Sequence, residues 1–251
     1  MNEVINCLMN HRSIRKFKDQ PVDPQLIETI LTAGTRAATA GNLQLYTLIV
    51  IDDQEKKEAL GVGHAPLAIA ALADHYRVKR WFEASGAEVD DEAIAAPRHL
   101  FLCFWDAIIA LQTVVVAAES LGLGTCYYGV ILSSNIAEMF SAPKFTFPAG
   151  LVAIGYPDEQ PELSIRLPLE AVVHHDRYRE FSDAELKALY AERERGPWEK
   201  LSPERREELK AQGINNVPQG LVRRKYSAEF SQKRSPGVIR NLKHAGFTLS
   251  D

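Results

Sequence analysis

The segment HRSIRKF gathers positive charge near the start of a chain whose formal net charge is −4. It places His11, Arg12, Ser13 and Arg15 within five residues of one another. Arginine binds phosphate through two parallel hydrogen bonds, and a serine hydroxyl can add another. Because Arg12 and Arg15 are three residues apart, one helical turn would place both on the same face. The segment predicts a phosphate site, and a solvated helix end is the alternative.

Two further segments favour a flavin mononucleotide (FMN) site. The segment ATAGNLQ lies between an expected helix and an expected strand. Its small residues allow the backbone to approach a planar ring closely, and Asn42 and Gln44 offer amide donors and acceptors. The segment RLP, which begins at Arg166, supplies another cation for the same phosphate.

Other kinds of site lack their usual motifs. The chain contains no GxGxxG or Walker loop, no HExxH motif and no GxSxG elbow. His174 and His175 are adjacent and would point to opposite faces of a strand, so we expect no metal. The net negative charge argues against a nucleic-acid partner. The three cysteines form no CxxC pair, and the first ten residues lack a signal-peptide core, so we expect a cytoplasmic protein.

The elements that must position these residues are helices alternating with a few strands, which indicates an α+β protein. Apolar spacing predicts a first helix over 2–10, and Asp23 with Pro24 predicts the start of a second. Runs of apolar residues predict strands over 46–51, 67–73, 149–156 and 171–174, and shorter helices over 54–60, 76–84 and 134–141.

One long apolar helix is expected in the middle of the chain. Asp106 predicts its N-cap, and the apolar run Ala107–Ala118 is shorter than the roughly 20 residues that span a bilayer, so we expect no membrane partner. The acidic segment Ser85–Pro97 before it is expected to be a mobile loop and is a candidate lid. The later chain has few large apolar residues. We expect a core over 1–180 and a dependent helical extension over 181–251, with a capping box at Ser182 and a last helix after Pro236.

Three segments in this order resemble the NAD(P)H-dependent nitroreductase and flavin reductase family, in particular its oxygen-insensitive branch with a long C-terminal extension. They are HRSIRKF, AAESLGLGTCYYG (117–129) and GLVAIGYPDEQPELSIRLP (150–168). The resemblance extends from about residue 3 to residue 180. It implies a three-layer sandwich with a central mixed sheet. It also implies an intertwined homodimer, with Ala107–Ala118 as a central dimer helix and two FMN sites at the interface, although a monomer core helix would have the same composition.

The resemblance also assigns site residues. His11, Arg12, Ser13 and Arg15 would bind the phosphate and ribityl groups, with Arg166 as a further phosphate ligand. The other flavin contacts would be Thr39, Ala40, Gly41 and Asn42 from the second subunit, and Tyr127, Tyr128 and Gly129. The chain departs from the family in having His64 where relatives often have a glutamine facing the flavin, and Ser164 where they often have lysine. His64 is equally well explained as a flavin contact or as a plain loop histidine.

The function that the resemblance implies needs no catalytic side chain, because FMN carries the chemistry. Two electrons would pass from NADPH or NADH to a nitroaromatic, quinone or flavin acceptor in ping-pong order. The basic C-terminal residues Arg223 and Arg224 would clamp the NADPH 2′-phosphate, or form a solvated helical face. A flavin carrier or sensor without turnover, a specialised flavin-using relative and a polyanion binder are the alternatives.

Overall fold

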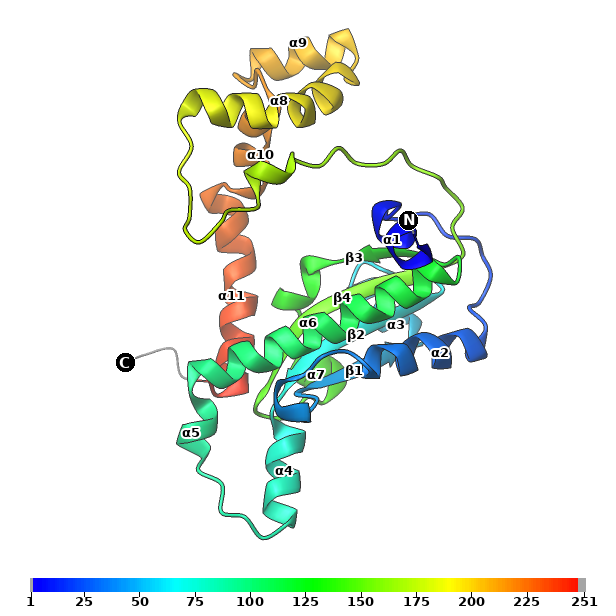
Figure 1. Cartoon of the computed structure of the whole chain (residues 1–251), viewed down its shortest axis with the longest axis vertical. Helices are drawn as coiled ribbons and strands as arrows, with labels where there is room; N and C mark the ends of the chain where they lie inside the picture. The colour runs from blue at the N-terminus through cyan, green and yellow to red at the C-terminus, as the bar shows by residue number, and fades with distance from the viewer. Residues whose placement is uncertain (1, 248–251) are drawn as a thin grey trace. The chain divides into compact units, whose positions relative to one another are not determined.

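The computed structural model describes residues 2–247. Contacts group them into a first unit, residues 2–162 with 235–247, and a second unit, residues 163–234. Figure 1 gives the order of the elements along the chain. The boundaries between these units lie after residues 162 and 234, whereas one boundary was expected near residue 180. The extent of the flavin-binding core stays a prediction.

The first unit is built around one four-stranded sheet in the order β1-β2-β4-β3. All three pairings between these strands are antiparallel, and the parallel component is a single isolated bridge between Ser13 and Thr125. The α+β class is confirmed, while the sheet is less mixed than expected. Strand β3 was not predicted because it has only four residues. The strands are β1 (Tyr46–Ile51), β2 (Leu67–Asp74), β3 (Gly124–Tyr127) and β4 (Thr146–Gly155).

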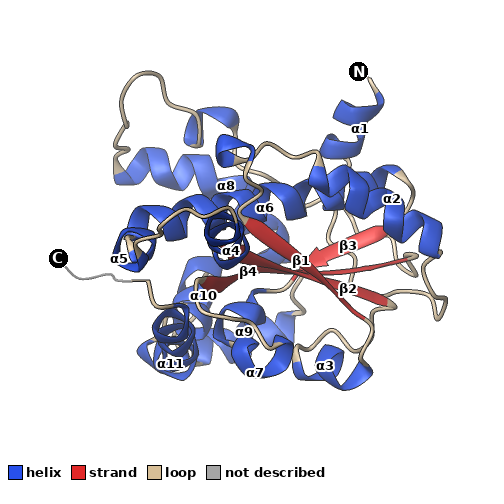
Figure 2. Ribbon diagram, turned by 90° about the horizontal axis from the view of Figure 1, so that it is seen from below, coloured by secondary structure: helices blue, strands red, loops and turns tan. Residues whose placement is uncertain are grey.

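Both faces of the sheet are covered, which confirms the three-layer arrangement (Figure 2). Every residue of β2 is buried, so its alternating side chains serve two cores. Ile69 belongs to the core shared with α2 (Pro24–Thr35) and α6 (Pro97–Ser120). Its neighbour Ala70 belongs to the core on the opposite face. That face is covered by the segments around α3 (Gln54–Ala59), η2 (Gly129–Ser133) and α7 (Ile136–Phe140).

Helix α6 begins ten residues earlier than predicted. Pro97 occupies its first turn, where a missing N–H costs nothing, and the helix ends at Ser120 before Gly122 with φ of 81°. Asp106 is therefore not the N-cap but lies buried in mid-helix. At 24 residues the helix is long and apolar enough to cross a bilayer, so the expected shortness was wrong. Its inner face packs against α2, β2 and β4, which is the position of a core helix.

Among the remaining elements of the first unit, the structure differs from the prediction in the segment 85–97. Helices α1 (Glu3–Met9) and α4 (Tyr76–Ala84) lie where expected. The segment predicted to be a mobile loop contains a short helix, α5 (Asp91–Ala95), because the Asp90 carboxylate caps it and Ile94 is buried.

The second unit is helical, with a short 3₁₀ turn, η3 (Leu169–Ala171), in place of the strand predicted over 171–174. No strand pairs with this segment among residues 2–247, so the apolar run has no ladder to join. The capping box predicted at Ser182 is present. The helices are α8 (Asp183–Glu199), α9 (Pro203–Ala211), α10 (Val217–Lys225) and the start of α11 (Ala228–Ala245).

Helix α11 continues from the second unit into the first. Pro236 lies inside it, so the prediction of a helix starting after that proline was wrong. In the first unit, α11 is held by Asn241, whose Nδ2 donates to the carbonyls of Leu132 and Ser134 at 2.9 and 2.8 Å.

Candidate functional site

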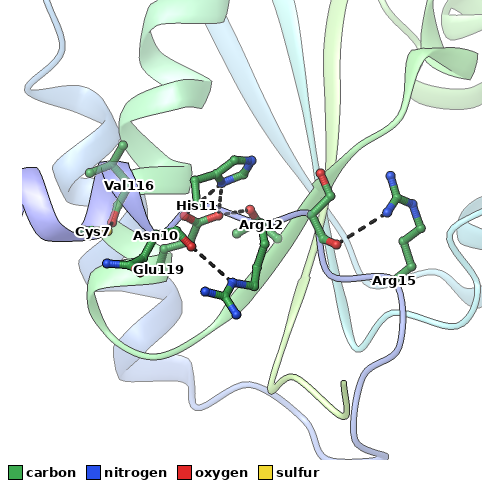
Figure 3. Close-up of polar contacts among 9 residues, drawn as sticks. Cys7, Asn10, His11, Arg12, Arg15, Val116 and Glu119 are labelled. Carbon is green, nitrogen blue, oxygen red and sulfur yellow. Dashed lines mark hydrogen bonds and ion pairs between the residues drawn. The ribbon is translucent and has the colours of Figure 1, made fainter. Parts of the chain in front are cut away.

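The basic segment near the N-terminus is extended rather than helical. Helix α1 ends at Met9, and the backbone N–H of Ile14 donates to the Thr125 carbonyl of β3 at 2.8 Å. Further along, Phe17 forms an antiparallel bridge with Pro157. The expectation that one helical turn aligns Arg12 and Arg15 was therefore wrong, and Figure 3 shows the two side chains reaching in different directions. Residues 11–17 are called the basic strip below.

Within the described residues of the first unit, the hydrogen bonds of both guanidinium groups of the basic strip go to carbonyl oxygens only. Arg12 donates to the Asn10 carbonyl at 3.3 Å and to the Pro161 carbonyl at 3.2 Å. Arg15 donates to the Ser13 carbonyl at 3.5 Å. Within the described residues of the first unit, neither arginine forms an ion pair with a carboxylate. Neither charge is taken up by an ion pair there, which leaves both guanidinium groups able to bind a phosphate.

His11 has a different role, because its ring is bound to the end of α6. His11 Nδ1 lies 2.8 Å from Glu119 Oε1, and the Thr125 hydroxyl donates to the same carboxylate at 2.5 Å. Glu119 thus connects the basic strip, α6 and β3 (Figure 3). The structure places His11 as a support of the strip, with one ring nitrogen already occupied.

A second carboxylate fixes the far end of the strip. Glu159 Oε1 accepts the backbone N–H groups of Arg15 and Lys16 at 2.6 and 3.0 Å. These two hydrogen bonds hold the pKa of the Glu159 carboxyl below its usual range.

We expect this attachment to be lost at acidic pH. A carboxyl whose pKa is lowered by folding stabilises the folded state above its ordinary pKa, and the stabilisation disappears as the pH falls through the lowered value. Hydrogen exchange at the amides of Arg15 and Lys16, corrected for the intrinsic pH dependence, should therefore show protection that falls below pH ~4. Glu159→Gln should remove this pH dependence. A wild-type protection factor that is flat across this range would contradict the expectation.

Aromatic rings form a wall beside the strip. The Phe17 and His64 rings stack with centroids 6.0 Å apart, and Tyr128 Oη lies 3.1 Å from His64 Nε2. Burial raises the pKa of Tyr128 above its ordinary value, so its hydroxyl stays protonated at neutral pH. Tyr127 at the end of β3 is 39% exposed, and a Cβ at Gly129 would meet open space. The structure thus brings the strip, His64 and residues 127–129 together, with room beside Gly129 for a ring.

The loop Thr39–Leu45 lies at the other end of the sheet. The loop leads into Tyr46 of β1, which pairs with Ala73 of β2. Ala73 in turn pairs with Phe147 near the start of β4. The basic strip joins β3 at Thr125, which pairs with Ile154. These two β4 positions are seven residues apart, or about 23 Å along a strand. Within one chain, Thr39, Ala40, Gly41 and Asn42 therefore do not meet the basic strip.

The loop owes its position to Asp106, a residue that the sequence analysis misassigned as a helix cap. Its carboxylate, only 3% exposed, accepts hydrogen bonds from the Thr39 hydroxyl and from the backbone of Ala40 and Leu45. A single carboxylate within the apolar run 100–111 is the feature of the sequence that could have indicated this role.

A pocket of about 1330 Å³ opens on the α1 side of the strip. It is lined by α1, by the C-terminal half of α6 and by residues 157–160. Arg12 lines it, whereas His64, Tyr127, Tyr128 and Gly129 do not. The pocket and the aromatic wall are thus different surfaces on either side of the strip.

Three predicted site residues belong to the second unit and are exposed there. Arg166 precedes η3, and Arg223 and Arg224 lie in the last turn of α10. Arg224 Nε donates to the Gly220 carbonyl at 3.2 Å. Their roles in binding phosphate and NADPH stay predictions.

Comparisons with known proteins agree with this geometry. The model of the Nitroreductase family matches residues 8–156. The chain is 33% identical over 193 residues to "FMN reductase (NADPH)" of Bacillus subtilis (strain 168), covering 73% of this chain and 77% of the relative. It is 33% identical over 199 residues to "Oxygen-insensitive NADPH nitroreductase" of Salmonella typhimurium (strain LT2), covering 76% and 81%. The solved structure of B. megaterium NfrA2 is 28% identical and superposes with a TM-score of 0.81 over 100% of both chains. The family resemblance of the sequence is confirmed, and the chain belongs to the nitroreductase family.

Proposed function

We propose that the protein is an FMN-dependent oxidoreductase that passes two electrons from NAD(P)H to a nitroaromatic, quinone or flavin acceptor. The observation that carries the proposal is the basic strip, in which neither Arg12 nor Arg15 is ion-paired within the first unit and Phe17 stacks on His64 of the aromatic wall. Cations for a phosphate and a ring-sized surface are adjacent, as a flavin mononucleotide needs. Relatives named FMN reductase and nitroreductase support the same activity.

Each part of the site has a distinct task. Arg12 and Arg15 bind the phosphate, with Ser13 as a hydroxyl donor and Arg166 as a further cation. The backbone of 127–129 faces the ring. When bound, FMN supplies the two-electron chemistry, and the chain contributes position and electrostatics.

The site is completed by a second copy of the chain. The loop Thr39–Asn42 and the basic strip lie at opposite ends of one sheet, so both can contact one flavin only if the loop comes from a partner. Phe101, Trp105 and Ile109 form an exposed apolar stripe with helical spacing on α6. Such a stripe marks an interaction surface. A homodimer buries it and brings the loops to the sites.

The test is a visible absorption spectrum of the purified protein before and after anaerobic addition of NADPH. A flavin band that bleaches with NADPH, followed by reoxidation with a quinone, supports the proposal. A yellow protein that neither bleaches nor turns over would instead be a carrier or sensor. A colourless protein that takes up no FMN would contradict the proposal.

The three free cysteines support the expected cytoplasmic location.

The nucleotide preference has its own test. Arg223→Ala and Arg224→Ala are expected to raise KM for NADPH by about tenfold, because each removes a charge-assisted contact with the 2′-phosphate. KM for NADH should change less than about twofold, since NADH has no such phosphate. Steady-state kinetics with both nucleotides makes the comparison. Equal effects on both would show that these arginines do not recognise the 2′-phosphate.

A further inference from the structure

A buried carboxylate lies in the middle of α6, on its inner side. Asp106 is 3% exposed and forms no ion pair within residues 2–247. Its charge is instead balanced by hydrogen-bond donors from one loop. The Thr39 hydroxyl donates to Oδ2 at 2.5 Å, the Ala40 N–H donates to Oδ1 at 3.1 Å, and the Leu45 N–H donates to Oδ2 at 3.2 Å. A buried carboxylate without a cation is retained only where such donors satisfy it.

These bonds hold the Thr39–Leu45 loop near both of its ends. Ala40 is its second residue and Leu45 its last, so one carboxylate binds backbone N–H groups that are five residues apart in the sequence. The Thr39 hydroxyl also accepts the Gln44 N–H at 2.8 Å, which makes it a relay between the loop and Asp106.

The backbone between these anchors is strained. Asn42 and Gln44 have φ of 57° and 50°, in the left-handed region that residues with a side chain rarely adopt. Such conformations persist only where the surroundings over-determine them. The Asp106 bonds supply much of that constraint, because three of the loop's donors have the carboxylate as their acceptor. The Arg77 guanidinium and the Asp74 N–H add bonds to the carbonyls of Gln44 and Leu45.

We infer that Asp106 is a positioning residue for the cofactor, which holds the Thr39–Leu45 loop in the conformation that contacts the flavin of the partner subunit. This inference rests on the proposed function. Through Asp106 the loop is fixed to α6, the longest helix of the first unit, so its shape is set before FMN arrives. Because the loop is already ordered, the free energy of FMN binding is not reduced by an entropic cost of ordering it.

Asp106→Asn is the main variant. An asparagine amide presents one acceptor oxygen and one NH₂ group, and that NH₂ group must face a loop N–H. The loop therefore loses at least one buried hydrogen bond without a change in side-chain size. We expect the dissociation constant for FMN to rise by about tenfold or more.

Asp74→Asn is the matched control. Asp74 is also a buried carboxylate, 6% exposed, and it accepts from the Thr47 hydroxyl at 2.5 Å and from the Arg77 N–H at 3.0 Å. None of its side-chain donors comes from the loop. Asp74→Asn should lower thermal stability to a similar extent but change the FMN dissociation constant less than about twofold. Thr39→Val and Thr47→Val repeat the comparison with a milder change.

Two measurements decide the outcome. FMN titration of the flavin-free full-length variants, followed by quenching of flavin fluorescence, gives the affinities. Hydrogen exchange of the flavin-free proteins reports the loop directly, and the Ala40 and Leu45 amides should exchange faster in Asp106→Asn than in Asp74→Asn.

Faster loop exchange together with weaker FMN binding, in Asp106→Asn and Thr39→Val but not in their controls, supports the inference. Equal affinities in Asp106→Asn and Asp74→Asn overturn it while leaving the proposed function intact, as does unchanged loop exchange. A wild-type protein that binds no FMN overturns the proposed function and the cofactor role of Asp106 with it.

Discussion

Replacing Arg12 by alanine should weaken FMN binding by roughly 10- to 150-fold, the range that corresponds to one charge-assisted hydrogen-bonded contact. The guanidinium group is half-buried on the basic strip, and its only partners in the first unit are the carbonyls of Asn10 and Pro161. No carboxylate of the first unit forms an ion pair with it. Arg15→Ala should have an effect of the same order. Equilibrium dialysis or fluorescence titration with FMN measures both.

Arg80→Ala is a suitable control for this experiment. Arg80 lies in α4 of the same unit and is paired with Glu83 at 2.7 Å, so its removal changes the net charge equally without touching the strip. Arg12→Lys adds a second comparison, because lysine keeps the charge but loses the planar fork. Full flavin occupancy in both alanine variants would show that the strip does not hold the phosphate.

The strands and most helices of the first unit could be predicted because local sequence and tertiary environment agree there. Two apolar runs bounded by turns form strands as expected: Tyr46–Ile51 is the edge strand β1, and Leu67–Asp74 is the central strand β2. Asp23 followed by Pro24 begins α2 as expected. These features depend on neighbours within a few residues, which a sequence displays directly.

The failures occurred where a distant partner decides the outcome. One helical turn was expected to align Arg12 with Arg15, but the basic strip lies extended because Ile14 donates to Thr125, more than a hundred residues away. Asp106 has the composition of an N-cap, yet its donors come from a loop 61 to 67 residues earlier in the chain. Pro236 was assigned to a helix start, whereas α11 continues through it.

In the candidate site, too, residues within a local motif could be predicted and their distant partners could not. Arg12 and Arg15 could be proposed from the sequence because arginine spacing in a recognisable segment is visible there. The partners Glu119, Glu159 and Asp106 were not, since a single carboxylate carries no local pattern. These three acids hold in place the segments to which the motif residues belong. Resemblance therefore locates the groups that would touch a ligand, and the structure adds the groups that would hold them still.

Gly237→Ala should destabilise the first unit by about 3 kcal/mol, although glycine to alanine in a helix normally stabilises. A Cβ at this position would lie 2.3 Å from the Ser133 carbonyl oxygen, which is backbone and cannot move aside. Helix α11 would have to separate from residues 132–134. That movement would also break the two hydrogen bonds of Asn241, a side chain that is 1% exposed.

The matched control is Gly220→Ala in α10, where the added Cβ would make only an ordinary contact with Ile214 at 3.6 Å. It should be neutral or stabilising by up to about 1 kcal/mol, because alanine is the better helix former. Urea unfolding followed by circular dichroism compares the two variants with the wild type. If Gly237→Ala unfolds at the same urea concentration as Gly220→Ala, then α11 does not pack against Ser133 in solution. The close approach of the two backbones makes the opposite result the expected one, since a methyl group has no space to occupy there.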